Sequence, residues 1–223
     1  MIDLEKRIVD LRKKAAVAAD WHGLGDQRAQ VVLVLDISKS MNALYKSGVV
    51  QRVIERMLAL ALNFDDDGAI DLYLFGTRAY RLPAVTLTEL DGYVSREILP
   101  NYKIIEATCY APPLHLIAER YRSPQPEPVF VIFLTDGGNS DRRESTEIIR
   151  SLSSQPVFIQ FVGIGAEDFP YLRKLDELPG RTVDNAGFMM VNDIDTVDDT
   201  ELYDRLLNEF PDWLQAAARQ RIV

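Results

Sequence analysis

The chain has 223 residues, of which 47% are hydrophobic and 26% are charged, and its formal net charge at pH 7 is −9. This composition is typical of a soluble globular protein, and the acidic balance argues against general binding of nucleic acid or anionic membranes, which requires clustered lysine and arginine. The single cysteine, Cys109, excludes an internal disulfide and a cysteine-based zinc site, and it favours a reducing compartment.

The N-terminal 28 residues predict an amphipathic helix followed by a turn. Apolar side chains recur at helical spacing within residues 3–19, at Leu4, Ile8, Leu11 and Ala15. The segment is charged throughout and lacks the apolar centre of a secretory signal, and no apolar run in the chain reaches the ~18 residues of a membrane span. We therefore expect residues 1–28 to pack, through their apolar stripe, on a domain formed by residues 29–223.

Strand-like and helix-like segments alternate in the rest of the chain. Aliphatic runs predict strands at 31–36, 69–75, 129–136 and 157–165, a short edge strand at 79–85 and a last strand at 187–193. Helical spacing predicts helices at 49–63, 87–99, 112–121, 143–153, 168–176 and 201–220, the last one broken near Pro211. Such alternation forms βαβ units, so we expect a doubly wound α/β fold with a mostly parallel sheet flanked by helices.

Polar side chains gather where this fold places its ligands, beyond the carboxyl ends of the strands. Asp36, Ser38 and Ser40 follow the first buried strand in the segment DISKS. Asp136 ends the 129–136 run in the segment TDGG, and Thr108 lies in the loop before the helix at 112. Two carboxylates and three hydroxyls form a set of oxygen ligands, which suits a hard cation such as Mg²⁺. Because Mg²⁺ takes octahedral oxygen coordination, a carboxylate from a partner could complete the shell.

These segments resemble the metal-ion-dependent adhesion site (MIDAS) of von Willebrand factor A (vWA) domains, Asp-x-Ser-x-Ser … Thr … Asp. The strand order resembles that Rossmann-like fold from about residue 29 to residue 210. The resemblance implies that Ser38, Ser40 and Thr108 supply hydroxyls, and that Asp36 and Asp136 bind the metal directly or through water. It also implies a Mg²⁺ ion, with Mn²⁺ or Ca²⁺ as alternatives, whose open position takes an acidic side chain of a partner protein.

Four longer segments are similar to the vWA domain of the TerF/TerY tellurium-resistance group: LEKRIVDLRKKA, DLYLFGTRAYRLP, TCYAPPL and LYDRLLNEFPDWL. This similarity implies a bacterial, cytoplasmic protein of stress or toxic-anion resistance, with TerD-type domains as candidate partners. The sequence shows no TerD-type segment, so we expect either a stand-alone protein or one domain of a longer chain.

Two other functions compete with this non-enzymatic binding module. A Mg²⁺-dependent phosphohydrolase is suggested by Asp36 at the end of a buried strand, where haloacid-dehalogenase-type phosphatases carry their nucleophile. That chemistry requires a second aspartate two residues on, where Ser38 stands. The sequence also contains no P-loop and no GxGxxG motif. The third hypothesis is a scaffold whose metal is purely structural.

The remaining polar residues are interpreted as structural. Cys109 is predicted to be a small buried hydrophobe, His115 to lie on a helix face, and His22 to lie in a turn without a partner. Lys39 is expected to point to solvent. Two acidic stretches are predicted to be solvated turns or loops: Asp65–Asp67, and the group Asp193, Asp195, Asp198 and Asp199.

Overall fold

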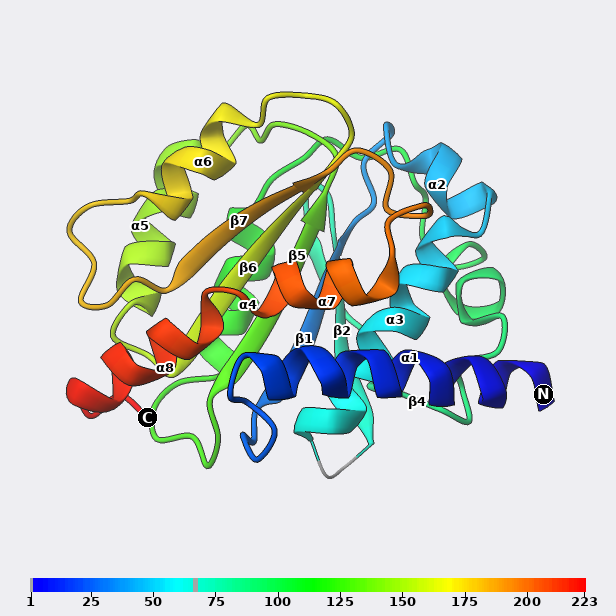
Figure 1. Ribbon diagram of the computed structural model, residues 1–223. Coiled ribbons are helices and arrows are strands. Elements are labelled where there is room, and N and C mark those ends of the chain that lie inside the picture. The colour runs from blue at the N-terminus through cyan, green and yellow to red at the C-terminus, as the bar shows by residue number, and fades with distance from the viewer. Residues whose placement is uncertain (1, 66–67) are drawn as a thin grey trace.

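The computed structural model describes residues 2–65 and 68–223, and in this part of the chain one sheet lies between two layers of helices (Figure 1). Its seven strands have the order β3-β2-β1-β5-β6-β7, with β4 paired to β2 beside this path. The strands are β1 (Gln30–Asp36), β2 (Ala69–Phe75), β3 (Ala79–Arg81), β4 (Val85–Thr86), β5 (Val129–Thr135), β6 (Val157–Ile164) and β7 (Ala186–Val191). Only β3 and β4 run antiparallel to their neighbour β2, so the structure confirms the doubly wound, mostly parallel α/β fold.

The central strands are apolar along their whole length because helices cover both faces of the sheet. Every residue of β5 and β6 is buried. Side chains of alternate residues point to opposite faces, so Phe130 and Ile132 pack in one layer while Val131 and Phe133 pack in the other. The sheet therefore organises two hydrophobic cores.

The two helical layers contain nine helical segments among the described residues. They are α1 (Ile2–Trp21), α2 (Asn42–Lys46), α3 (Val49–Phe64), the π-helical turn η1 (Val94–Ile98), α4 (Ala111–Arg120), α5 (Arg142–Leu152), α6 (Pro170–Asp176), α7 (Asp199–Leu207) and α8 (Phe210–Arg219). Side chains of α1, α3, α7 and α8 fill the core on one face, and those of α4, α5 and α6 fill the core on the other. Figure 1 shows α1 running beside α7 in front of the sheet.

The strand order places the predicted site at a topological switch point. β2 pairs with one side of β1 and β5 with the other, so the chain reverses its direction across the sheet between β1 and β5. In open α/β sheets a ligand crevice lies beyond the carboxyl ends of the strands at such a point. Asp36 is the last residue of β1, and Asp136 follows β5 directly.

The predicted secondary structure differs from the observed elements at three places. The helix predicted over 87–99 is reduced to η1, because Gly92 adopts φ +62° and interrupts the turn before it. The strand predicted at 79–85 divides into β3 and β4 on either side of Pro83. The polar turn after Ser40 contains the short helix α2. The predicted break of the C-terminal helix near Pro211 is confirmed, because Pro211 lies in the first turn of α8.

Helix α1 packs its apolar stripe onto α3 and α7. Leu11 and Ala15 are buried in the core on this face, at 5% and 0% exposure. Two ion pairs fasten the helix at its flanks: Arg7 Nη2 lies 2.5 Å from an oxygen of the buried Glu55, and Lys14 Nζ lies 2.9 Å from Asp199. The division of the chain at residue 28 stays a prediction.

The prediction that the aspartates around residue 195 form a solvated loop is wrong for Asp195 and Asp199, which pair with arginines of α3, whereas Asp193 and Asp198 are exposed. Asp195 accepts two hydrogen bonds from the guanidinium of Arg52, at 2.5 and 2.8 Å. Asp199 accepts one from Arg56 at 2.8 Å. Asp198 caps α7 by accepting from the backbone N–H groups of the helix's first turn. The two arginines are one helical turn apart on α3, so they hold the entry to α7 against that helix.

The junction between α7 and α8 contains an acidic residue in an unfavourable environment, Glu209. The pKa of its carboxyl is raised to about 7, chiefly by burial. The neighbouring carboxylates of Asp176 and Asp184 contribute to this increase, whereas Arg181 lowers the pKa. The side chain packs close to Gly187, where an added Cβ would lie 2.8 Å from Glu209 Oε2. Ionisation of this carboxyl therefore opposes folding.

The variant Glu209→Gln is expected to be more stable than the wild type at pH 8. Because the folded-state pKa is raised from its ordinary value of 4.5, wild-type stability falls as pH rises from about 4.5 to about 7, and glutamine removes that loss. For a half-buried group we expect a gain of ~1–2 kcal/mol, or a few degrees in Tm. Thermal unfolding at pH 4 and pH 8 tests this, and a gain of equal size at both pH values would contradict it.

Candidate metal site

Asp36 is held at the end of β1 with both carboxylate oxygens engaged. The residue is 0% exposed. Its Oδ1 accepts from the backbone N–H of Ser38 at 2.7 Å, and its Oδ2 accepts from the hydroxyl of Thr135 at 2.6 Å. Thr135 is the last residue of β5, so the neighbouring strand fixes the orientation of the carboxylate.

A chain of hydroxyls connects this carboxylate loop to Asp136. Ser38 Oγ lies 3.1 Å from Ser40 Oγ, and the hydroxyl of Ser40 donates to Asp136 Oδ1 at 2.8 Å. Ser38 is buried, whereas Ser40 is exposed and Asp136 is half-buried. Four of the five predicted ligands are therefore close together, and the set opens to solvent on the side of Ser40.

Thr108 lies in the loop that forms the third wall of the site. Two backbone contacts hold this loop: the N–H of Lys39 donates to Glu106 O at 3.2 Å, and the carbonyl of Thr108 accepts from the N–H of Ser140 at 3.1 Å. Among the described residues, no hydrogen bond joins the Thr108 hydroxyl to the other four predicted ligands. The structure thus places the loop beside the site, and the role of this hydroxyl stays a prediction.

The electrostatics of the site favour a cation. Burial raises the pKa of Asp36 to about 6 despite its hydrogen bonds from Thr135 and Ser38, and the nearby Asp136 carboxylate adds to the increase. Burial also raises the pKa of Asp136, and the negative charge of Glu167 adds to it. In the described part of the chain, no lysine or arginine forms an ion pair with either aspartate. A buried carboxylate of this kind is costly unless a cation compensates it, so the donor set fits a divalent metal.

Three further residues build the site and were not identified from the sequence. Thr135 orients Asp36, as described above. Glu106 accepts from the hydroxyl of Thr77 at 2.6 Å and from the hydroxyl of Tyr80 at 3.1 Å, which ties the loop of Thr108 to the turn after β2. Asp141 accepts from the first N–H groups of α4 at 2.7 and 2.9 Å and so caps that helix from another loop. Of these three residues, only Thr135 could have been found from the sequence, because it directly precedes Asp136.

Comparison with known proteins identifies the family of the chain. A family model described as vWA-TerF-like, the vWA domain found in the TerF C terminus, matches residues 28–223. The chain belongs to the vWA-TerF-like family. The matched range of this vWA domain contains all strands of the sheet and all five predicted metal ligands, whereas α1 lies before it.

The proteins similar to this vWA domain include one bacterial relative and several structures that share its fold. The "Uncharacterized protein YcbR" of Bacillus subtilis (strain 168) is 41% identical over 220 residues, which cover 96% of this chain and 90% of YcbR. Proximal thread matrix protein 1 from the mussel byssus, solved with a zinc-occupied MIDAS motif, matches with a TM-score of 0.56 and 15% identity over 84% of this chain. The von Willebrand factor type A structure from Catenulispora acidiphila matches with a TM-score of 0.57 and 15% identity over 81% of this chain. This vWA domain spans only 48% of the mussel chain and 43% of the Catenulispora chain, and these likenesses show the fold.

Cys109 and Lys39 flank the site of the vWA domain. The prediction that Cys109 is a buried small hydrophobe is wrong, because the residue is half-exposed and its Sγ lies 3.2 Å from the hydroxyl of Ser140. Lys39 is exposed, as predicted. Within the described residues, no group of three or more His, Cys, Asp or Glu side chains is placed to hold a metal ion. The predicted site contains only two such carboxylates and relies on hydroxyls for the rest.

Both histidines contact acidic side chains away from the site. His115 lies on the exposed face of α4, where its Nε2 is 2.9 Å from a carboxylate oxygen of Glu144. His22 was predicted to lack a partner, but its Nε2 is 2.9 Å from Asp204 Oδ1. The two residues meet because the C-terminal end of α1 packs against α7. Residues 66–67, which belong to the predicted acidic turn, lie outside the described residues. No helix in the described part of the vWA domain is long and apolar enough to cross a membrane.

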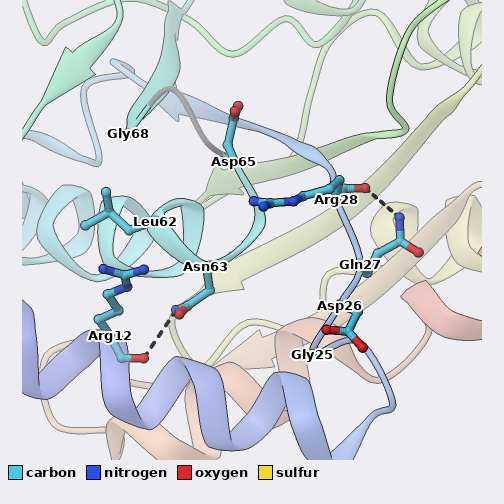
Figure 2. A pocket seen from close by; sticks show the side chains of 9 residues that line it. All are labelled: Arg12, Gly25, Asp26, Gln27, Arg28, Leu62, Asn63, Asp65 and Gly68. Atoms are coloured by element: carbon cyan, nitrogen blue, oxygen red, sulfur yellow. Dashed lines mark hydrogen bonds between the residues drawn. The ribbon is translucent and has the colours of Figure 1, made fainter.

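A hollow of about 540 Å³ lies at the other end of the sheet from Asp36 (Figure 2). It is lined by α1, the turn before β1 and the end of α3, and two of its amide groups already bond to backbone carbonyls. Asn63 Nδ2 donates to Arg12 O at 3.2 Å, and Gln27 Nε2 donates to Arg28 O. Its polar side chains do not converge on a common point in Figure 2, in contrast to the oxygens around Asp36.

Proposed function

We propose that this vWA domain is a protein-interaction module that depends on a divalent cation. In this proposal Asp36, Ser38, Ser40, Thr108 and Asp136 hold the metal, and the open side of the site takes an acidic side chain of a partner protein. The observation that carries the proposal is the fully buried Asp36 carboxylate, which pairs with no cationic side chain of the described residues and is linked through two serine hydroxyls to Asp136.

The chemistry of the donor set supports Mg²⁺, with Mn²⁺ or Ca²⁺ as alternatives. All five donors are oxygens, and hard cations prefer oxygen ligands while keeping some positions for water. Two carboxylates balance the charge of one divalent ion only formally, because both also accept hydrogen bonds from neighbouring donors. The zinc-occupied MIDAS motif of the mussel protein supports metal binding at this position of the fold.

The family relationship supports a role in bacterial stress or tellurium resistance. The matched family is named for TerF, and a relative with 41% identity belongs to a bacterium. We therefore propose a cytoplasmic protein whose candidate partners include TerD-type domains. We propose no nucleic-acid or membrane partner because the net charge of the chain is −9.

The geometry favours this module over a phosphohydrolase. A nucleophilic aspartate must reach the phosphorus of its substrate, whereas Asp36 is 0% exposed and uses both oxygens within the protein. The position two residues on, where the acid/base aspartate of that chemistry would stand, is occupied by the hydroxyl of Ser38. A purely structural metal is the remaining competitor, and it differs in having no position that a partner can enter.

The test is a titration of the purified protein with Mn²⁺, followed by calorimetry and by water-proton relaxation. We expect saturable binding that Mg²⁺ displaces, an enhanced relaxation that reports exchangeable water on the metal, and a decrease of that enhancement when a glutamate-containing peptide is added. Saturable binding without exchangeable water would support the structural metal instead. Mg²⁺-dependent hydrolysis of p-nitrophenyl phosphate, absent from an Asp36 variant, would support the phosphohydrolase.

A further inference from the structure

A basic groove lies between α5 and α6 of this acidic protein. The hollow has a volume of about 570 Å³. Its charged lining consists of four cationic side chains and one anionic side chain: Arg142, Arg143, Arg150, Lys174 and Glu147. The groove thus has a net charge of +3, in a chain whose total is −9. We call this surface the α5–α6 groove.

The cations of the α5–α6 groove are only weakly neutralised within the protein. Arg143 pairs with Glu147 at 3.2 Å, but the two side chains are 93% and 60% exposed, so the pair is screened by water. Arg150 donates to the carbonyl of Pro179 rather than to a carboxylate. In the described part of the chain, Lys174 forms no ion pair. Several cations held this close repel one another, and an anion in the groove would relieve that repulsion.

The floor of the groove is rigid. Tyr171 is 6% exposed, and its hydroxyl donates to Arg142 O at 2.8 Å and lies 3.1 Å from Thr146 Oγ1. The guanidinium of Arg142 lies over the ring of Tyr171, 5.4 Å from its centroid. This cation–π contact leaves the N–H donors of the exposed Arg142 side chain available to a carboxylate.

Arg142 also connects the groove to the candidate metal site. Together with Tyr171 it lines an adjoining hollow of about 160 Å³, whose wall includes Gly137 and Gly138, the two residues after Asp136. An added Cβ at Gly137 would meet nothing within 4 Å, and one at Gly138 would lie 3.6 Å from Arg142 Nη2. A chain segment that leaves the metal therefore passes over two glycines and reaches the basic groove.

We propose that the α5–α6 groove binds an acidic stretch of the same partner protein whose carboxylate enters the metal site. The proposal rests on the proposed function for its metal-bound residue, but the groove itself consists of groups that hold no metal. The partner segment has two acidic parts, one carboxylate at the metal and a group of aspartates or glutamates in the groove. Charge complementarity between this group and the four cations supplies the attraction.

The surface between the two parts defines the partner further. Glu167 and Asp168 also line the adjoining hollow, and Asp168 is 3.5 Å from Arg173. These carboxylates repel negative charge, so the residues of the partner that cross Gly137 and Gly138 are neutral. A nucleic acid, which has a negative charge at every phosphate, fits this pattern less well than an acidic protein segment does.

The test uses a fluorescent peptide with one glutamate, a short glycine spacer and a run of about five glutamates, the spacer being set by the reach of an extended chain. Fluorescence anisotropy at low salt measures its affinity, both with Mg²⁺ and with EDTA. The double variant Arg143→Glu, Lys174→Glu is expected to weaken binding about tenfold under both conditions, since attraction becomes repulsion at two positions. The matched control Lys13→Glu, Arg219→Glu makes the same change in net charge at exposed positions of α1 and α8, and its affinity is expected to stay within about twofold.

Each outcome decides the proposal. Equal weakening by both double variants would show that only net charge matters and would overturn it, as would an unchanged affinity in the groove variant. Tighter binding of an oligothymidylate of the same length would assign the groove to nucleic acid instead. A groove effect that persists in EDTA, combined with no response to Mg²⁺, would support the groove and contradict the proposed function, so the two failures are distinguishable.

Discussion

The variant Asp36→Asn is expected to lose detectable binding of Mg²⁺ and Mn²⁺ while it keeps the native fold. Asparagine has the shape of aspartate and retains one oxygen that accepts from the N–H of Ser38, and the Thr135 hydroxyl can turn its hydrogen away and accept from the new amide N–H. The change removes one of the two negative charges of the site, without which a divalent ion is poorly compensated. Calorimetric titration of wild type and variant measures the loss, and circular dichroism verifies the fold.

The matched control for this prediction is Glu167→Gln. Glu167 is an exposed carboxylate whose charge acts on Asp136, but it is not one of the predicted ligands. Its removal changes the local charge by the same amount, and we expect metal affinity to fall by less than about threefold because the interaction is screened by solvent. Unchanged metal affinity in Asp36→Asn would show that the metal binds elsewhere. An equal loss of affinity in both variants would show that the metal responds only to the local negative charge. The metal-free Asp36→Asn protein should be no less stable than the wild type, since it lacks a buried ionisable carboxyl.

The variant Ala15→Asp is expected to destabilise the protein by several kcal/mol and to release α1 from the domain. Ala15 is 0% exposed in the interface between α1, α3 and α7. An aspartate there is either buried without a partner, at a cost of several kcal/mol, or forces the helix away. Release would also leave the buried carboxylate of Glu55 without its ion pair to Arg7. Since typical domains are stable by only ~5–15 kcal/mol, we expect a large decrease in the urea midpoint.

The control for α1 is Val17→Asp on the opposite, exposed face of the same helix. Val17 is 61% exposed, so the same substitution should change the free energy of unfolding by less than about 1 kcal/mol. Equal, small effects of Ala15→Asp and Val17→Asp would mean that α1 is dispensable and that residues 29–223 form a self-sufficient domain. A large effect of Ala15→Asp alone would make α1 part of the folding unit, although the family model begins at residue 28.

The order of strands and helices was predictable from the sequence because it depends on local pattern. Buried parallel strands are continuous apolar runs such as VFVIFLT, and amphipathic helices repeat their apolar residues every three or four positions. The positions of Asp36, Ser38, Ser40, Thr108 and Asp136 followed from the same pattern, since each lies at or beyond the carboxyl end of a strand or in the loop before a helix. Local rules failed at the helix predicted over 87–99, where a left-handed Gly92 limits the helix to one turn.

Only the tertiary structure decided which distant groups meet. Asp195 pairs with Arg52 across 143 positions of the chain, and Asp141 caps a helix that begins 30 residues before it. The α5–α6 groove likewise combines residues of two helices that are separated in the chain by strand β6. In the sequence, each helix by itself predicts only an ordinary solvent-exposed face. These contacts depend on the crossovers of the chain over the sheet and on the orientation of each helix, neither of which is encoded in local periodicity. The sequence by itself determined the fold class and the oxygen-bearing side chains at the sheet edge, whereas ion pairing, loop anchoring and the charge of the groove arose from packing.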